Sequence, residues 1–357
     1  MRGVIWDGQQ LIVTDELTLR SLGPGEVRVK VLASGVCHTD INMMDAGLVG
    51  VPVILGHEAA GEVVELGAGV AGFTPGEAVM VGTQAPCGTC RECLRGEPEN
   101  CDVTWGFRPS QPFGWKGKPV YSFANVSSFA GEIVVRASQL YRTAGIAPEQ
   151  AALIGCAVST GYYAARKLGR IHAGDRVVVF GVGGIGVNAI QAAKLAGAEV
   201  FAADVNPAKE AVARSFGADG FLLVPAGATS CALADLVRAH GPIDVAVECS
   251  GAPVAVEAAI HGVKRGGRVV LIGMAKPGTT ASFSLEAVTG GREIISVMNG
   301  GARPEQDYPE LIRMIREKQL DVAGQVTRIW PLAQVAQAIA ALRAGEVTRA
   351  ALDHTIT

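Results

Sequence analysis

The chain has 357 residues, of which 49% are hydrophobic and 18% charged, and its formal net charge is −3. A single hydrophobic core stops growing near roughly 250–300 residues, so this length favours two domains. The nearly neutral balance gives no electrostatic basis for binding nucleic acid or an anionic membrane surface. No apolar run reaches the roughly 18 residues of a membrane span, and the first ten residues lack a signal-peptide pattern, so we expect a cytoplasmic protein.

The first third of the chain has the alternation and the glycine-rich breaks of a β-rich domain. The pattern predicts short strands rather than a parallel sheet, at residues 10–13, 27–33, 51–55, 61–66, 79–82 and 132–135. Residues 102–130 are predicted to be a loop. Trp105 and Trp115 in this loop would lie either at a pocket mouth or in ordinary packing.

Two possible metal ligands lie between these strands. Cys37 is in the segment GVCHTD and His57 is in GHEAAG, and thiolate and imidazole are ligands that transition metals prefer. Two ligands do not define a site. A third candidate, Cys156, is in a segment predicted to be a helix over 151–165, but a single cysteine with apolar neighbours is more typical of a small buried side chain.

A second group of cysteines is more specific. Its four members have the spacing Cys-x2-Cys-x2-Cys-x7-Cys and are Cys87, Cys90, Cys93 and Cys101. In a cytoplasmic protein such spacing favours a metal site over disulfides, and four thiolates close a tetrahedral Zn²⁺ site with Zn–S bonds of about 2.3 Å. Unbound thiols, disulfides and an iron–sulfur cluster are the alternatives. Because sulfur fills all four positions, such a metal is structural.

The pattern changes after residue 174. The apolar strand 176–180 is followed by GVGGIG at 181–186, a helix to about residue 196 and a strand at 199–203. A glycine motif in this context predicts a dinucleotide site, with Gly181 and Gly183 at the pyrophosphate and Gly186 where helix and strand pack closely. Asp204, 18 residues beyond Gly186, is expected to bind the ribose hydroxyls, which favours NAD over NADP; the alternative is an acid that caps a loop.

Further strand–helix alternation predicts a doubly wound parallel sheet. The expected elements are a helix at 208–216, a strand at 243–248, a helix at 254–261 and a strand at 268–272. After residue 300 the chain returns to its first character, with helices at 308–318 and 332–343 and a strand at 350–356. The predicted class is α/β. We expect residues 158–300 to form the nucleotide-binding domain, inserted into a catalytic domain made from residues 1–157 and 301–357.

Five segments together resemble the zinc-dependent alcohol dehydrogenases of the medium-chain dehydrogenase/reductase family. They are GVCHTD, GHEAAG, the four-cysteine loop, GCAVSTG at 155–161 and GVGGIG, in the order typical of the family and across nearly the whole chain. The resemblance implies a β-rich GroES-like catalytic domain and a Rossmann domain. It also implies an NAD-dependent enzyme that interconverts an alcohol with an aldehyde or ketone, with two zinc ions per chain.

The resemblance assigns roles to the residues of the catalytic domain. It implies that Cys37, His57 and Cys156 bind the catalytic zinc, with the fourth position open for water or alcohol. Glu58 would lie near the metal as a transient ligand, Asp40 would orient the histidine, and Thr39 would relay the alcohol proton. Relatives often end this relay at a histidine three positions beyond Thr39. Here that position is Asn42, which is not a base at neutral pH, so we expect the proton to leave by another route.

Cofactor and substrate contacts follow from the same resemblance. Beyond the glycine motif and Asp204, the expected cofactor residues are His38, Thr160, Gly184, Ile185, Lys209, Met274 and Arg349, and the charged members could instead be solvated surface charges. The expected pocket comprises Leu48, Thr83, Phe123 and Ala124, with Met274 beside it. Its small side chains at 83 and 124 suggest a bulky or aromatic alcohol. A homodimer or homotetramer is expected by analogy.

Three alternatives stay open. In place of an alcohol dehydrogenase that exchanges its NAD, the sequence also fits an aldehyde reductase or a dehydrogenase that retains its NAD and recycles it with a second substrate. The third alternative is a non-catalytic NAD-binding regulatory protein. The last alternative does not account for Cys37, Thr39, His57 and Cys156 occurring together.

Overall fold

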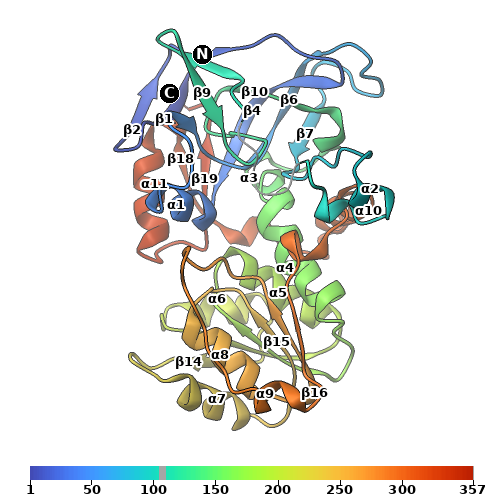
Figure 1. The fold of residues 1–357 in the computed structure, drawn as a ribbon, viewed down its shortest axis with the longest axis vertical. Helices are drawn as coiled ribbons and strands as arrows, with labels where there is room; N and C mark the ends of the chain where they lie inside the picture. Colours follow the sequence, from blue (N-terminus) through green and yellow to red (C-terminus); the bar gives the residue numbers. More distant parts are fainter. Residues whose placement is uncertain (104–109, 357) are drawn as a thin grey trace. The chain divides into compact units, whose positions relative to one another are not determined.

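The computed structural model describes residues 1–103 and 110–356, and these form two compact units (Figure 1). The first unit contains Met1–Cys156 and Arg303–Thr357, and the second contains Ala157–Ala302. The sequence predicted the changes of domain after residues 157 and 300. Among the described residues no helix is both long and apolar enough to cross a membrane.

The first unit is built from two sheets. One sheet has the order β2-β1-β5-β9-β8-β3, and the other has the order β11-β7-β6-β4-β19-β18, with β10 also paired to β4. The strands are β1 (Gly3–Trp6), β2 (Leu11–Thr14), β3 (Thr18–Leu19), β4 (Glu26–Val36), β5 (Val53–Ile54), β6 (Glu58–Leu66), β7 (Ala78–Val81), β8 (Phe113–Trp115), β9 (Lys118–Ser122), β10 (Glu132–Arg136), β11 (Leu140–Arg142), β18 (Val326–Pro331) and β19 (Arg349–Asp353). Pairing is antiparallel except for β5 with β9 and β18 with β19.

Alternation along β4 explains how this unit forms its core. Val27, Val29 and Val31 are buried, whereas Arg28 and Lys30 point to the other face, as expected for period-two side-chain placement. The last strand, β19 (red in Figure 1), pairs antiparallel with β4 and so joins the two ends of the chain. The helices are α1 (His38–Asp45), α2 (Arg91–Leu94), α3 (Pro148–Ala151), α10 (Pro304–Arg316) and α11 (Val335–Arg343), with 3-10 turns η1 (Pro98–Asn100), η2 (Ala137–Gln139), η6 (Ala323–Gln325) and η7 (Leu332–Gln334).

The second unit contains one six-stranded sheet, parallel throughout, of order β14-β13-β12-β15-β16-β17. Numbered from its first strand this is the order 3-2-1-4-5-6 of dinucleotide-binding folds. The strands are β12 (Arg176–Phe180), β13 (Glu199–Asp204), β14 (Gly220–Leu223), β15 (Ile243–Glu248), β16 (Val263–Leu271) and β17 (Glu293–Ile295). The helices are α4 (Ser159–Tyr163), α5 (Gly184–Leu195), α6 (Lys209–Ser215), α7 (Ser230–Arg238), α8 (Pro253–Gly262) and α9 (Glu286–Thr289), with a 3-10 turn η5 (Met298–Gly301).

The boundary between the units falls within a π-helical turn, η3 (Ile154–Val158), and a second such turn, η4 (Ala164–Leu168), follows α4. The sequence predicted one helix over 151–165 and gave no sign of these wider turns. Such turns are rare and often occur at functional sites. Cys156 lies in the first of them.

The predicted α/β class is confirmed, and several element boundaries are corrected. The loop expected over 102–130 is wrong where β8 and β9 form a hairpin, and Trp105 lies outside the described residues. The helix expected at 308–318 begins earlier, at Pro304, because proline is suited to the first turn of a helix. The final strand ends at Asp353 rather than at residue 356. Helix α1 was not predicted.

Candidate metal centres and nucleotide-binding loop

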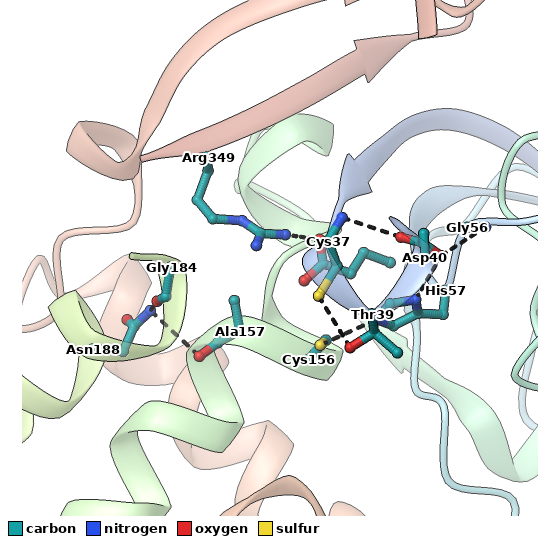
Figure 2. A network of polar contacts seen from close by, with 11 residues as sticks. Cys37, Thr39, Asp40, Gly56, His57, Cys156, Ala157, Gly184, Asn188 and Arg349 are labelled. Atoms are coloured by element: carbon teal, nitrogen blue, oxygen red, sulfur yellow. Dashed lines mark hydrogen bonds and ion pairs between the residues drawn. The ribbon is translucent and has the colours of Figure 1, made fainter. Parts of the chain in front are cut away.

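Three possible metal ligands in the first unit come from separate elements. Cys37 follows β4 and is the N-cap residue of α1, His57 immediately precedes β6, and Cys156 lies in η3. Their ligand atoms all lie within 4.8 Å of one another, so the structure brings together the three residues that the family resemblance implies as ligands (Figure 2). The separation of His57 Nε2 from Cys156 Sγ is 3.3 Å, close to the roughly 3.5 Å expected between nitrogen and sulfur ligands of one tetrahedral zinc ion.

The carboxylate of Asp40 organises two of these ligands. It accepts hydrogen bonds from His57 Nδ1 at 2.9 Å, from the Gly56 amide at 3.0 Å and from the Cys37 amide at 3.1 Å (Figure 2). Asp40 is completely buried. Because a carboxylate only accepts, Nδ1 of the imidazole carries a hydrogen, and Nε2 is the ring nitrogen that faces Cys156 and could bind a metal through its lone pair. Thr39 lies beside the cluster, with its hydroxyl oxygen 3.6 Å from Cys37 Sγ.

A buried ion pair lies next to the metal ligands. Glu58 is fully buried and pairs with Arg349, which is 3% exposed. A Cβ atom at Gly35 would collide with the Glu58 carboxylate, so GVCHTD requires glycine at this position. Among the described residues the ligand cluster contains Cys37, His57 and Cys156 but not Glu58, and a ligand role for Glu58 stays a prediction.

Electrostatics within the cluster favour a bound cation. A hydrogen bond from the Cys156 thiol, and the adjacent His57, hold the pKa of Cys37 well below its usual value. The same bond, together with burial, raises the pKa of Cys156. Burial raises the pKa of Glu58 to about 7, although the charge of Arg349 opposes this shift. One thiol is thus stabilised as a thiolate at the expense of its neighbour, and a divalent cation would stabilise both.

The four-cysteine loop forms the second candidate metal centre. The sulfurs of Cys87, Cys90, Cys93 and Cys101 lie within 4.8 Å of one another, and those of Cys90 and Cys101 are 3.9 Å apart. Tetrahedral zinc with Zn–S bonds of about 2.3 Å places its sulfurs about 3.8 Å apart. The Thr89 hydroxyl and the amides of Thr89 and Cys90 donate to Cys87 Sγ and lower its pKa to about 6. These contacts fit four thiolates around one ion.

In the second unit the glycine loop connects β12 to α5. Both oxygens of Asp204, at the end of β13, are engaged: they accept the Val182 amide at 2.8 Å and the Asn206 amide at 2.9 Å. Asp204 therefore fixes the loop in addition to its predicted ribose contact. A Cβ atom at Gly186 would collide with the Gly181 carbonyl, which explains the close approach of helix and loop.

The remaining predicted residues differ in exposure. Lys209 is 8% exposed and Arg349 is buried, so the alternative of solvated surface charges does not hold for these two, whereas His38 is exposed. Leu48 is 59% exposed and Met274 37% exposed. The buried members of the predicted sets are Thr83, Phe123, Ala124 and Thr160, and Ile185 is partly buried. Their substrate and cofactor roles stay predictions.

Sequence reasoning missed three contacts around the cluster. The Phe123 ring lies edge-on to His57 with centroids 5.8 Å apart, the Tyr308 hydroxyl donates to the Gly155 carbonyl at 3.3 Å, and Arg349 pairs with Glu58. One sequence signal was available. An arginine within the apolar run VTRAAL of a buried strand requires a buried acidic partner.

Comparison of the sequence with known proteins finds families and relatives whose descriptions agree with a zinc-binding dehydrogenase site. Residues 23–145 match the family described as the alcohol dehydrogenase GroES-like domain, and residues 184–317 match the zinc-binding dehydrogenase family. The chain is 30% identical to alcohol dehydrogenase-like 6 of Arabidopsis thaliana, over 98% of this chain and 94% of that protein. It is 31% identical to alcohol dehydrogenase class-3 of Drosophila melanogaster, over 98% and 96%.

A solved structure is similar along almost the whole chain. Benzyl alcohol dehydrogenase of Acinetobacter calcoaceticus has a TM-score of 0.89 at 25% identity and covers 99% of this chain, which covers 98% of that one. The two family matches, the similar relatives and the two candidate metal centres show that the chain belongs to the zinc-dependent alcohol dehydrogenases of the medium-chain dehydrogenase/reductase family. The predicted GroES-like and Rossmann-type domains are thereby confirmed.

Proposed function

We propose that this chain oxidises bulky or aromatic primary or secondary alcohols to aldehydes or ketones, reversibly, with NAD as the hydride acceptor. The observation that carries the proposal is the convergence of Cys37, His57 and Cys156 around one point, with Asp40 fixing the imidazole. These residues would hold the catalytic zinc. Zinc bound there would lower the pKa of an alcohol oxygen at its open position.

The chain's own residues then have distinct tasks. Asp40 keeps the Nδ1 hydrogen in place, so His57 presents its Nε2 lone pair. Thr39, whose hydroxyl lies beside Cys37, would accept the alcohol proton and pass it outward. Asn42, three residues further on, has no basic group at neutral pH. We therefore propose that the proton leaves through water rather than through a basic side chain at this position.

The glycine loop supports the choice of NAD. The negative charge of Asp204 lies at the loop that the Val182 amide belongs to. A 2′-phosphate on the ribose would be repelled by this carboxylate, whereas ribose hydroxyls would donate to it. The second unit would thus hold the cofactor at the N-terminus of α5, where the helix dipole favours phosphate.

The proposed substrate size rests on the residues expected to line the pocket. Thr83 and Ala124 are small and buried, and the similar structure from Acinetobacter calcoaceticus is a benzyl alcohol dehydrogenase. We extend that substrate class to this chain as part of the proposal. We also propose two zinc ions per chain, a cytoplasmic location, and a homodimer or homotetramer that associates through the nucleotide-binding unit, whose terminal strand β17 carries the partly exposed Ile294.

The test is a survey of NADH formation with aliphatic, aromatic and secondary alcohols, together with metal analysis. We expect two zinc ions per chain and higher efficiency with benzyl alcohol than with ethanol. Activity confined to ethanol would refute the substrate class. One metal per chain and no turnover would support a binding protein instead. NAD that stays with the protein through gel filtration would support the cofactor-retaining alternative.

A further inference from the structure

A buried amide side chain lies at the end of the 3-10 turn η2, immediately before β11 and outside the metal cluster. Gln139 is 2% exposed. Its Oε1 accepts the Arg136 amide at 3.0 Å, and its Nε2 donates to the Gly82 carbonyl at 2.8 Å and to the Asn125 carbonyl at 3.2 Å. The Gln139 backbone carbonyl also accepts the Gly82 amide at 2.8 Å. The side chain therefore joins two segments that are far apart in the sequence.

Both segments carry residues of the proposed alcohol pocket. Gly82 immediately precedes Thr83, and Asn125 immediately follows Phe123 and Ala124. A second bond runs directly between the segments, from Asn125 Nδ2 to the Thr83 carbonyl at 3.4 Å. The Phe123 ring contacts the ring of His57. The separation of the two segments thus determines the distance between Thr83 on one segment and Phe123 and Ala124 on the other.

One of these segments has a backbone that needs support. Ala124, Asn125 and Ser127 have φ values of 51°, 60° and 63°. Left-handed conformations of residues other than glycine cost about 1 kcal/mol or more each and persist where the surroundings hold them. Ser127 Oγ accepts the Phe123 amide at 2.8 Å, and Gln139 holds the Asn125 carbonyl. Without the bond from Gln139, one of the contacts that hold this strained backbone is lost, and Ala124 is held less firmly.

We propose that Gln139 is a positioning residue that fixes the width of the alcohol pocket and so sets the preference for bulky over small alcohols. The inference rests on the proposed function, because that function places Thr83, Phe123 and Ala124 at the substrate. Gln139 acts through the two segments it joins. A wider or mobile pocket loses contact with a large alcohol on both sides, whereas a two-carbon alcohol bound at the metal has little contact to lose.

The test compares Gln139→Met with a matched control, Gln337→Met, at an exposed position of α11. Methionine has a similar volume but cannot donate to the two carbonyls. We expect kcat/KM for benzyl alcohol to fall at least about 10-fold, mainly through KM, while the value for ethanol changes less than about 3-fold. The control variant should resemble the wild type with both alcohols.

Asn125→Gly is the second variant, because glycine adopts φ near 60° without strain and removes only the bond to the Thr83 carbonyl. It should shift the benzyl-to-ethanol ratio in the same direction but by less. If Gln139→Met does not fold, an unchanged ratio in Asn125→Gly still overturns the inference, because the bonds between the two segments would then not set the preference. An unchanged ratio, or equal losses with both alcohols, overturns the inference while the proposed function stands. A wild-type chain that oxidises neither alcohol overturns both.

Discussion

Substitution of Asp40 by asparagine tests the geometry of the metal cluster most directly. The carboxylate accepts three N–H groups, two on one oxygen and one on the other. An asparagine side chain has one acceptor oxygen, so in either orientation its NH₂ group faces at least one N–H donor. In the better orientation the amide oxygen keeps Gly56 and His57, and only the Cys37 amide loses its partner.

The magnitude follows from that count. Loss of one bond to a charged acceptor inside the protein costs about 1.5–3 kcal/mol. Outer partners of metal-bound histidines typically contribute about 10–100-fold to metal affinity, which is about 1.4–2.8 kcal/mol. The two ranges agree, and we expect the catalytic zinc of the Asp40→Asn variant to be bound about 10–100-fold more weakly.

A competition titration with a chromophoric chelator measures this change. The four-cysteine site serves as an internal reference, because its ligands make no contact with Asp40 among the described hydrogen bonds. Asp45→Asn is the control on the same helix: Asp45 is exposed and its pairing with Arg343 is a surface ion pair of little energetic weight. If the Asp40→Asn variant holds both zinc ions with wild-type affinity, the assigned role of Asp40 is wrong.

Three further predictions concern other parts of the chain. Asn42→His would supply a base at the end of the proton relay, and the pH profile of hydride transfer should gain a step near the pKa of histidine, about 6.5; an unchanged profile counts against the relay. Asp204→Ser should raise KM for NAD at least about 10-fold and lower the ratio of NAD to NADP efficiency, because it removes both the repulsive charge and the anchor of the Val182 amide; an unaltered ratio would refute the ribose assignment. Burial lowers the pKa of His354 to about 4, so its neutral imidazole stabilises the fold fully above pH 6.5 and on the order of 3 kcal/mol is lost as the pH falls toward 4. The free energy of unfolding, measured by denaturation across this pH range, should depend less steeply on pH in His354→Gln than in the wild type. Identical pH dependences would show that His354 is not the source of the loss of stability.

The second unit was predictable because its pattern is local. The run RVVVF, the glycine motif and Asp204 lie within 29 residues, and their order dictates a strand, a tight turn, a helix and a second strand. The ligand set came from a different source. Nothing in the residues around Cys156 separated it from an ordinary buried cysteine until the family resemblance was considered.

What the sequence did not reveal depends on contacts between distant residues. Arg349 and Glu58 meet because β19 pairs with β4, which itself pairs with β6, and no local pattern encodes that order. Helix α1 was missed because it has only eight residues, and its start depends on the Asp40 bond to the Cys37 amide. The hairpin of β8 and β9 is short, and its glycine-rich surroundings have the composition of a loop.

The position of Cys156 at the end of the first unit limits how this protein can be recombined. The second unit begins at the very next residue, Ala157, so one peptide bond separates a proposed zinc ligand from the nucleotide-binding unit. A chimaera that exchanges this unit with a junction a few residues upstream would replace the cysteine with whatever the donor carries. A donor without cysteine at that point would leave two ligands from the parent protein. Exchange of the cofactor specificity by transplanting the unit therefore requires that the π-helical turn Ile154–Val158 stay with the catalytic domain.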